Sequence, residues 1–165
     1  MDVLRWLRHL SAPRWRMRRR FDAAVRALIE REVKAAEARH GGEICFVVEG
    51  ALPWPLLWRG CGPRERALQL FAALSVWDTE GNNGVLIHVL FADHSVEFVA
   101  DRGISCRIAA ADWEPLCREV EAHYRAGRFA EGSAAAIRGV AGLLVRYFPQ
   151  QGPDRDELPN QPLLL

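Results

Sequence analysis

The 165-residue sequence lacks the features that would assign it to a membrane or exported class. No uncharged apolar run approaches the roughly 20 residues that a membrane-spanning helix needs, and no apolar stretch follows the basic start as in a signal peptide. The four cysteines form no CxxC pair, and a chain without an export signal normally keeps its cysteines reduced. We therefore expect a cytoplasmic protein, at most peripheral to the inner face of a membrane.

Lysine is almost absent, since Lys34 stands alone against 21 arginines, and the net charge of +1 hides an asymmetry. Residues 1–20 carry seven arginines and one aspartate, so this segment has a charge of +6 and the rest of the chain −5. The composition divides the chain into a basic amphipathic arm (1–20), a body (21–148) and a proline-rich tail (149–165) that we expect to be loose.

The body alternates between helical and strand patterns. Apolar residues at helical spacing predict helices over 21–36, 63–77, 112–126 and 137–148. Continuous apolar runs predict strands over 44–48, 84–91 and 96–100. The strand, helix, strand order makes the first two strands parallel, and the short turn at Asp93 and His94 makes the third antiparallel. The expected fold class is therefore α/β with a small mixed sheet.

Three spaced motifs resemble the TPM domain family, which takes its name from thylakoid-lumen and photosystem II repair proteins and a receptor modulator. They are Asn82-Asn83-Gly84-Val85-Leu86-Ile87, residues 96–104 (VEFVADRGI) and residues 125–132 (RAGRFAEG). The resemblance covers residues 21–148 and implies a three-layer α/β/α sandwich around a mixed sheet. It identifies the chain as a short member of bacterial type, without the signal peptide and membrane anchor that many members carry.

The resemblance also implies two activities, acid phosphatase activity and calcium binding, without one shared mechanism. The chain departs from the family at the loop after the hairpin. Asp101-Arg102-Gly103 stands there in place of the family's glycine-aromatic-glycine turn. A family site that uses this backbone loop would be altered, although the loop gains a carboxylate and a guanidinium.

Oxygen-bearing side chains are expected to gather at one edge of the sheet. An antiparallel hairpin returns its second strand to the edge where the first began, so Asp101 and Arg102 should lie beside Asn83 and Gly84. The i, i+2, i+4 spacing of Asp78, Glu80 and Asn82 resembles the start of a loop that binds Ca²⁺ or Mg²⁺. It is not an EF-hand, because the twelfth position falls on Val89 in a strand. The predicted metal ligands are Asp78, Glu80, Asn82, Asn83 and Asp101.

Two alternatives apply to this edge. Arg102 could hold a phosphate oxygen while the carboxylates hold the metal, the arrangement expected for metal-assisted phosphate hydrolysis. In the simpler interpretation, Asp78 and Glu80 are a solvated helix terminus, Gly81 is a turn and the two asparagines bond to nearby backbone.

The basic arm predicts a second kind of contact. Val3, Trp6, Leu7 and Leu10 fall on one helical face, and a run of arginines with interleaved apolar residues follows. Such a segment suits an anionic membrane surface, or equally a helix packed on its own domain or on a second copy. Nucleic acid is disfavoured, because the body is net negative and carries no nucleic-acid-binding motif. The residues assigned to the membrane or a protein partner are Trp6, Arg14, Trp15, Arg16, Arg18, Arg19 and Arg20.

Three other features receive structural interpretations. The apolar connector 52–58 is expected to fold over the sheet edge and extend the core. His88 is expected to be a hydrogen-bonded core histidine, and Cys61 a structural cysteine.

The sequence therefore predicts a cytoplasmic accessory or binding module with an unidentified protein partner and a polar edge that binds a divalent cation. A weak metal-dependent acid phosphatase and a peripheral membrane-surface adaptor are the alternatives.

Overall fold

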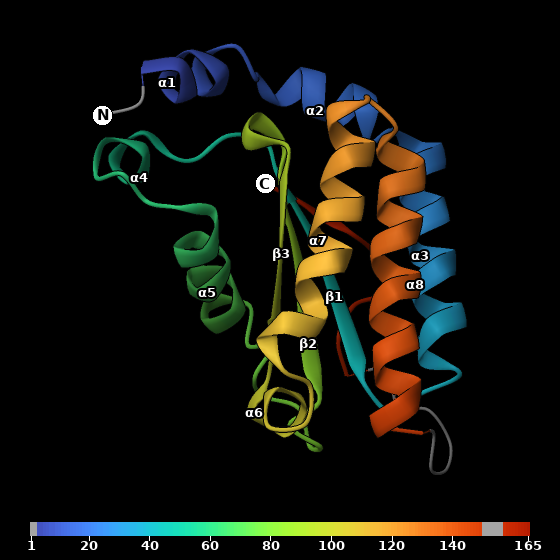
Figure 1. Ribbon diagram of the computed structural model, residues 1–165. Coiled ribbons are helices and arrows are strands. Elements are labelled where there is room, and N and C mark those ends of the chain that lie inside the picture. The colour runs from blue at the N-terminus through green and yellow to red at the C-terminus, as the bar shows by residue number, and fades with distance from the viewer. Residues whose placement is uncertain (1–2, 150–156) are drawn as a thin grey trace.

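The computed structural model describes residues 3–149 and 157–165 (Figure 1). Among these residues a small β-sheet is enclosed by helices. The elements in chain order are α1 (Val3–Leu10), α2 (Arg14–Arg20), α3 (Ala23–Glu37), β1 (Glu43–Glu49), α4 (Trp54–Trp58), α5 (Pro63–Ala73), β2 (Gly84–Leu90), the 3-10 helix η1 (Phe91–Asp93), β3 (Ser95–Ala100), α6 (Arg102–Ser105), α7 (Ala110–Arg125), α8 (Phe129–Tyr147) and β4 (Leu163–Leu164).

The sheet is mixed, as predicted. Its strand order is β3-β2-β1-β4, with β1 and β2 parallel from Glu43↔Gly84 to Glu49↔Leu90, and β2 and β3 antiparallel. Every residue of β1 and β2 is buried. Both strands lack the alternation of a half-exposed strand because helices cover both faces of the sheet.

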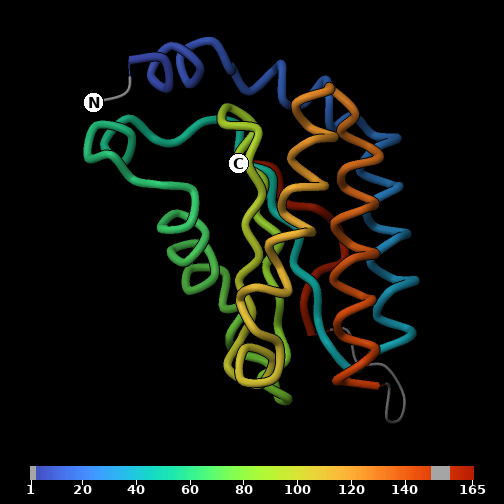
Figure 2. Tube along the Cα trace, in the orientation of Figure 1, coloured from blue at the N-terminus to red at the C-terminus, as the bar shows by residue number. Residues whose placement is uncertain are grey.

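The helices form the two outer layers of the predicted α/β/α sandwich. Figures 1 and 2 show α5 on one face and α3, α7 and α8 on the other. Successive strand residues serve opposite cores: Phe46 and Ile87 belong to the larger cluster under α3, α7 and α8. Cys45 and Leu86 belong to the smaller cluster under α5.

The basic arm lies across the end of the sheet where β1 and β2 finish (Figure 1). Its helix α1 is joined to the turn after β2, because Arg5 Nε lies 2.9 Å from Asp93 Oδ2. Met17 of α2 is buried in the main core. The arm is thus packed on the body.

The end of the chain differs from the expected loose tail. Leu163 and Leu164 form β4, which pairs in parallel with Val47 and Val48 of β1. Leu165 extends the pairing, since its N–H donates to Val48 O at 2.9 Å and its carbonyl accepts from Gly50 N at 3.2 Å. The tail therefore closes one side of β1, and only residues 150–156 of it lie outside the described part of the chain.

Several helix boundaries also differ from the expectation, and the largest difference is that α8 begins at Phe129, eight residues before Ile137. Helix α5 ends at Ala73, and Trp77, expected on its apolar stripe, is half exposed. Helix α7 begins at Ala110, so Asp112 is not the N-cap itself; its carboxylate accepts instead from Ala109 N at 3.0 Å.

The connector 52–58 extends the core only in part. Leu52 and Leu57 are buried with Leu90, but Trp54 and Trp58 on the short helix α4 are more than half exposed. The two tryptophans therefore do not join the core that the connector was expected to extend.

Candidate functional site

The polar edge forms where β2 begins and β3 ends. Asp101 N donates to Gly84 O at 2.9 Å, so the hairpin brings these residues together as predicted. The Asp101 side chain caps α6 by accepting from Arg102 N at 2.6 Å through Oδ1. Asp101 is only 7% exposed, and its Oδ2 is buried without a hydrogen-bond partner among the described residues. The polar edge therefore contains a buried carboxylate oxygen that the described residues leave unpaired.

Arg102 fastens this edge to the loop before β2. Its Nε donates to Asn82 Oδ1 at 2.8 Å, and Asn82 O accepts from Gly103 N at 3.1 Å. Asn82 has φ of 48°, in the left-handed region that asparagine tolerates better than most residues. The amide oxygen of Asn82 is thus already occupied by a guanidinium, which reduces its value as a cation ligand.

Asn83 ties the same loop to the segment before β1. Its Nδ2 donates to Gly41 O, and its backbone N–H donates to Thr79 Oγ1 at 3.1 Å. Its Oδ1 is buried and has no hydrogen-bond partner among the described residues. Sequence reasoning missed Thr79, although a threonine in a loop, here four residues before Asn83, can accept a bond from nearby backbone.

The remaining predicted ligands, Asp78 and Glu80, are exposed. The backbone N–H of Glu80 donates to Glu157 Oε2 in the tail at 3.0 Å, and Glu157 N donates to Glu43 Oε2 at 3.2 Å. Within residues 3–149 and 157–165, no three His, Cys, Asp or Glu side chains are grouped so as to hold a metal ion. A cation here would therefore depend on amide, backbone or water oxygens beside Asp101.

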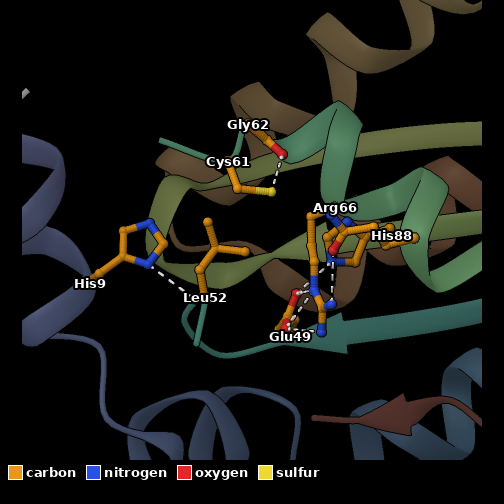
Figure 3. Close-up of polar contacts among 8 residues, drawn as sticks. His9, Glu49, Leu52, Cys61, Gly62, Arg66 and His88 are labelled. Atoms are coloured by element: carbon orange, nitrogen blue, oxygen red, sulfur yellow. Dashed lines mark hydrogen bonds and ion pairs between the residues drawn. The ribbon is translucent and has the colours of Figure 1, made fainter. Parts of the chain in front are cut away.

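Helix α1 is packed with its polar side inward. Arg5 and His9 face the body: Arg5 pairs with Asp93, and the buried His9 accepts from Leu52 N through Nδ1 at 3.1 Å (Figure 3). The aliphatic residues of α1 are turned outward, and each of them is more than half exposed: Val3, Leu4, Leu7 and Leu10. The periodicity identified an amphipathic helix but not that its apolar side would be left uncovered.

Trp6 joins α1 to α4. Its ring lies 4.8 Å from that of Trp54 and 5.5 Å from that of Trp58, both in edge-on geometry. The two α4 tryptophans nevertheless remain more than half exposed. Helices α1 and α4 thus lie next to each other at this end of the molecule (Figure 1), and each carries exposed apolar side chains.

Helix α2 contributes positive charge to the same end of the molecule as α1 (Figure 1). Arg14, Arg16, Arg18, Arg19 and Arg20 are all exposed, as is Trp15. Within the described part of the chain, none of these five arginines is in a salt bridge. We call the exposed apolar residues of α1, α2 and α4 together with these arginines the apolar-basic face.

A buried ionic cluster lies between β1, β2 and α5 (Figure 3). Arg66 Nη2 lies 2.7 Å from Glu49 Oε1, and His88 Nε2 lies 3.3 Å from Glu49 Oε2. Burial alone would raise the pKa of Glu49, but its contacts with His88 and Arg66 outweigh burial and hold that pKa below the ordinary value. The bonds from Arg66 to Glu49 fasten α5 to the sheet. His88 is a buried core residue as expected, but neither of its ring nitrogens has a hydrogen-bond partner among the described residues.

Cys61, near the start of α5, is fully buried and its thiol donates to Gly62 O at 3.6 Å (Figure 3). Burial and the neighbouring Glu65 raise its pKa. A thiol that stays protonated is a poor nucleophile, so the structural interpretation of Cys61 holds.

Comparison with known proteins agrees with the sandwich architecture. The model of the TPM domain family matches residues 18–143, and the chain belongs to that family. The chain is also similar to the BA42 protein from the psychrophilic bacterium Bizionia argentinensis, whose structure was determined by NMR. The two share 26% identity and a TM-score of 0.74, over 87% of this chain and 94% of BA42. No curated protein matches. Among the described residues, no helix is both long and apolar enough to cross a membrane.

Proposed function

We propose that this TPM-domain protein is an accessory binding module that attaches peripherally to an anionic membrane surface through its apolar-basic face. The observation that carries the proposal is the orientation of α1. Arg5 and His9 bind the body, while Val3, Leu7 and Leu10 point to solvent. Contiguous exposed apolar surface of this kind marks an interaction site.

The composition of the face favours a membrane as the occupant. Each large apolar side chain gains about 1.5–3 kcal/mol when it is fully buried, so the leucines and tryptophans favour insertion into the boundary between headgroups and acyl chains. Each arginine near an anionic surface adds about 1 kcal/mol. The five arginines of α2 have no acidic partner among the described residues, so their charge is free to act on lipid.

The negative leaflet facing the cytoplasm is the surface that basic segments of this kind prefer. We therefore place the protein in the cytoplasm, at the inner face of a membrane. Cell fractionation tests this: the protein should sediment with membranes at low salt and be released at high salt, because the arginine contribution is screened.

Vesicle co-sedimentation tests the proposal directly. The protein should bind vesicles that contain phosphatidylglycerol and not vesicles of phosphatidylcholine alone. Leu7→Glu should reduce binding about tenfold or more, because it places a charge in the apolar stripe. Leu68→Glu is the matched control, since Leu68 is also exposed but lies on α5.

Two outcomes would overturn the membrane as occupant. Equal effects of Leu7→Glu and Leu68→Glu on vesicle binding would remove α1 from the contact. A dimer in light scattering that Leu7→Glu dissociates, without vesicle binding, would assign the face to a second copy of the chain.

A second candidate function is favoured by one observation, the buried and unpaired Oδ2 of Asp101. A hard cation such as Ca²⁺ or Mg²⁺ suits this oxygen and the unpaired Oδ1 of Asn83. The exposed carboxylates of Asp78 and Glu80 would supply further oxygens if the ion draws the loop inward. We hold this cation site, and the metal-dependent phosphatase activity that the family resemblance implies, as the alternative to the membrane module.

Thermal unfolding in chelator, and then in millimolar Ca²⁺ or Mg²⁺, tests the cation site. A cation bound only by the folded state raises the midpoint, and Asp101→Asn should abolish that rise. Asp22→Asn is the matched control, because Asp22 also caps a helix, accepting from Val25 N at 3.0 Å. Turnover of a phosphate ester that survives both Asp78→Asn and Asp101→Asn would exclude this edge as a catalytic site.

A further inference from the structure

A hollow of about 390 Å³ lies between α2 and the turn after β2. Its lining combines three guanidinium groups with two aromatic rings: Trp15, Arg16, Arg19, Arg20 and Phe91. Arg14 and Arg18, on the same helix, do not line it. The arginines of α2 are thus divided into a group that lines the hollow and a group that does not.

The guanidinium groups of the hollow retain most of their hydrogen-bonding capacity. Arg16 Nη1 donates to Ser11 O at 2.6 Å, and the guanidinium of Arg20 lies 5.9 Å from the centre of the Phe129 ring. Within the described residues, no carboxylate forms a salt bridge with Arg16, Arg19 or Arg20. Guanidinium donors bind phosphate oxygens in a bidentate manner, and this arrangement leaves such donors available.

The surroundings do not neutralise this charge. Asp93, the carboxylate of η1, is occupied by Arg5 and by His9, whose Nε2 lies 3.3 Å from Asp93 Oδ1. His94, whose ring lies 6.1 Å from that of Phe91, has its pKa lowered by burial and by the positive charges of Arg8, Arg125 and Arg16. The hollow therefore lies in a region of positive potential that suits an anionic ligand.

We propose that this hollow binds the phosphate group of an anionic lipid headgroup and prefers a phosphomonoester, such as that of phosphatidic acid. A phosphomonoester carries a charge of about −1.5 to −2 near neutral pH, whereas the diester of phosphatidylglycerol carries a single charge. Three arginines that line one hollow favour the more highly charged phosphate. The inference rests on the proposed membrane function and adds the class of headgroup.

The position of the hollow agrees with this assignment. It is built on α2, which follows α1 across the same end of the molecule (Figure 1), so a headgroup could enter it while the leucines of α1 contact the acyl chains. Trp15, which lines the hollow, is itself 63% exposed and suits the membrane interface, where tryptophan is enriched.

The test compares vesicles that contain phosphatidic acid with vesicles that contain phosphatidylglycerol, matched in surface charge. We expect about tenfold tighter binding to phosphatidic acid. The double variant Arg19→Gln/Arg20→Gln should abolish this preference. Arg14→Gln/Arg18→Gln removes the same charge from the same helix outside the hollow, so it should weaken binding to both vesicles equally and leave the preference intact. Thermal unfolding of each variant checks that the fold is retained.

Three results would overturn the inference. Equal binding to the two vesicle types by the unmodified protein would exclude headgroup preference, while vesicle binding that depends on Leu7 would still support the proposed function. If the two double variants had equal effects on vesicle binding and on the preference for phosphatidic acid, the arginines of the hollow would contribute only general positive charge. Binding of glycerol 3-phosphate or inorganic phosphate that requires Arg19 and Arg20, without any preference among vesicles, would assign the hollow to a soluble phosphate.

Discussion

Arg5 and Asp93 are 88 residues apart in the sequence, and Arg5 Nε lies 2.9 Å from Asp93 Oδ2. This pair determines which side of α1 faces the protein. Burial alone would raise the pKa of Asp93, but its contacts with His9 and Arg5 outweigh burial and lower that pKa. The ionised carboxylate therefore binds the polar side of α1, and the apolar side is left for another surface.

Asp93→Asn should detach α1 and lower the free energy of unfolding by about 1.5–3 kcal/mol, the range for a hydrogen bond to a charged group. Urea unfolding measures the loss, and limited proteolysis should cleave the variant within the arm. Glu65→Gln is the control, because Glu65 pairs with Arg59 at 2.6 Å while both side chains are more than half exposed. Glu65→Gln should lower the free energy of unfolding by less than about 1 kcal/mol. An equal decrease in both variants would contradict the role given to Asp93.

The contribution of Asp93 should also depend on pH in a defined direction. A carboxylate whose pKa is lower in the folded state stabilises the fold above its unfolded pKa, 3.8 for Asp93, and this contribution disappears as pH falls through the folded value. The stability difference between the unmodified protein and Asp93→Asn should therefore be constant from pH 7 to 5 and shrink in more acidic buffer. A difference that persists undiminished below pH 3 would rule out the ionised form as its source.

His40 should make the protein less stable in mild acid. Burial lowers its pKa from 6.5 to about 4, and its Nδ1 accepts from Gly42 N at 3.2 Å. The unfolded chain takes up a proton below pH 6.5 while the folded protein resists it, so stability falls by at most about 1.4 kcal/mol per pH unit from 6.5 toward 4.

The test is urea unfolding at several pH values with His40→Asn, whose side-chain oxygen can still accept from Gly42 N. This variant should show a shallower fall between pH 6.5 and 5, a range in which Asp93 and Glu49 stay ionised. An unchanged slope in His40→Asn would exclude His40 as the titrating group.

The central fold could be predicted because its signals are local. The apolar runs of β1 and β2 indicate buried strands wherever their neighbours lie, and the turn at Asp93 and His94 determines the antiparallel pairing of β3. The adjacency of Asp101 and Gly84 followed from that hairpin alone. Local pattern and topology together were sufficient for the mixed sheet and for the location of the polar edge, whereas the three-layer sandwich was implied by the resemblance to the TPM domain family.

The features that the sequence did not predict depend on contacts between residues that are far apart in the chain. Periodicity shows which residues of α1 share a side, but the inward side is decided by Arg5 and Asp93, 88 residues apart. Strand β4 has two residues and follows prolines that indicate a loose segment, so only its pairing with β1 reveals it. The bond from Glu80 N to Glu157 Oε2 spans 77 residues and has no local signal.

Strand β4 gives a prediction that separates its two leucines. Leu164 packs against the main core, whereas Leu163 is 38% exposed. Leu164→Ala should lower the free energy of unfolding by about 1–2 kcal/mol, below the value for a fully buried leucine because its side chain is only partly covered. Leu163→Ala should change it by less than about 0.5 kcal/mol. Equal, small effects in urea unfolding would show that β4 contributes little to the sheet.

Gly103 tests how closely the loop before β2 must approach α6. A Cβ at Gly103 would lie 2.4 Å from Asn82 O, and Gly103 N donates to that same oxygen at 3.1 Å. Gly103→Ala should therefore push the loop away, break this bond and destabilise the protein by about 1–3 kcal/mol. Because Arg102 and Asn82 would separate as well, any rise in the unfolding midpoint with Ca²⁺ or Mg²⁺ should also be lost.

Gly142→Ala is the matched control for Gly103→Ala. Gly142 lies in α8, and a Cβ there would meet nothing within 4 Å. Since alanine is the better helix former, this variant should gain about 0.5–1 kcal/mol. Opposite signs for the two variants are the expected result. A neutral Gly103→Ala would mean that the loop yields without cost, and the polar edge would then be too pliable to hold Asp101 and Asn83 in place for a cation.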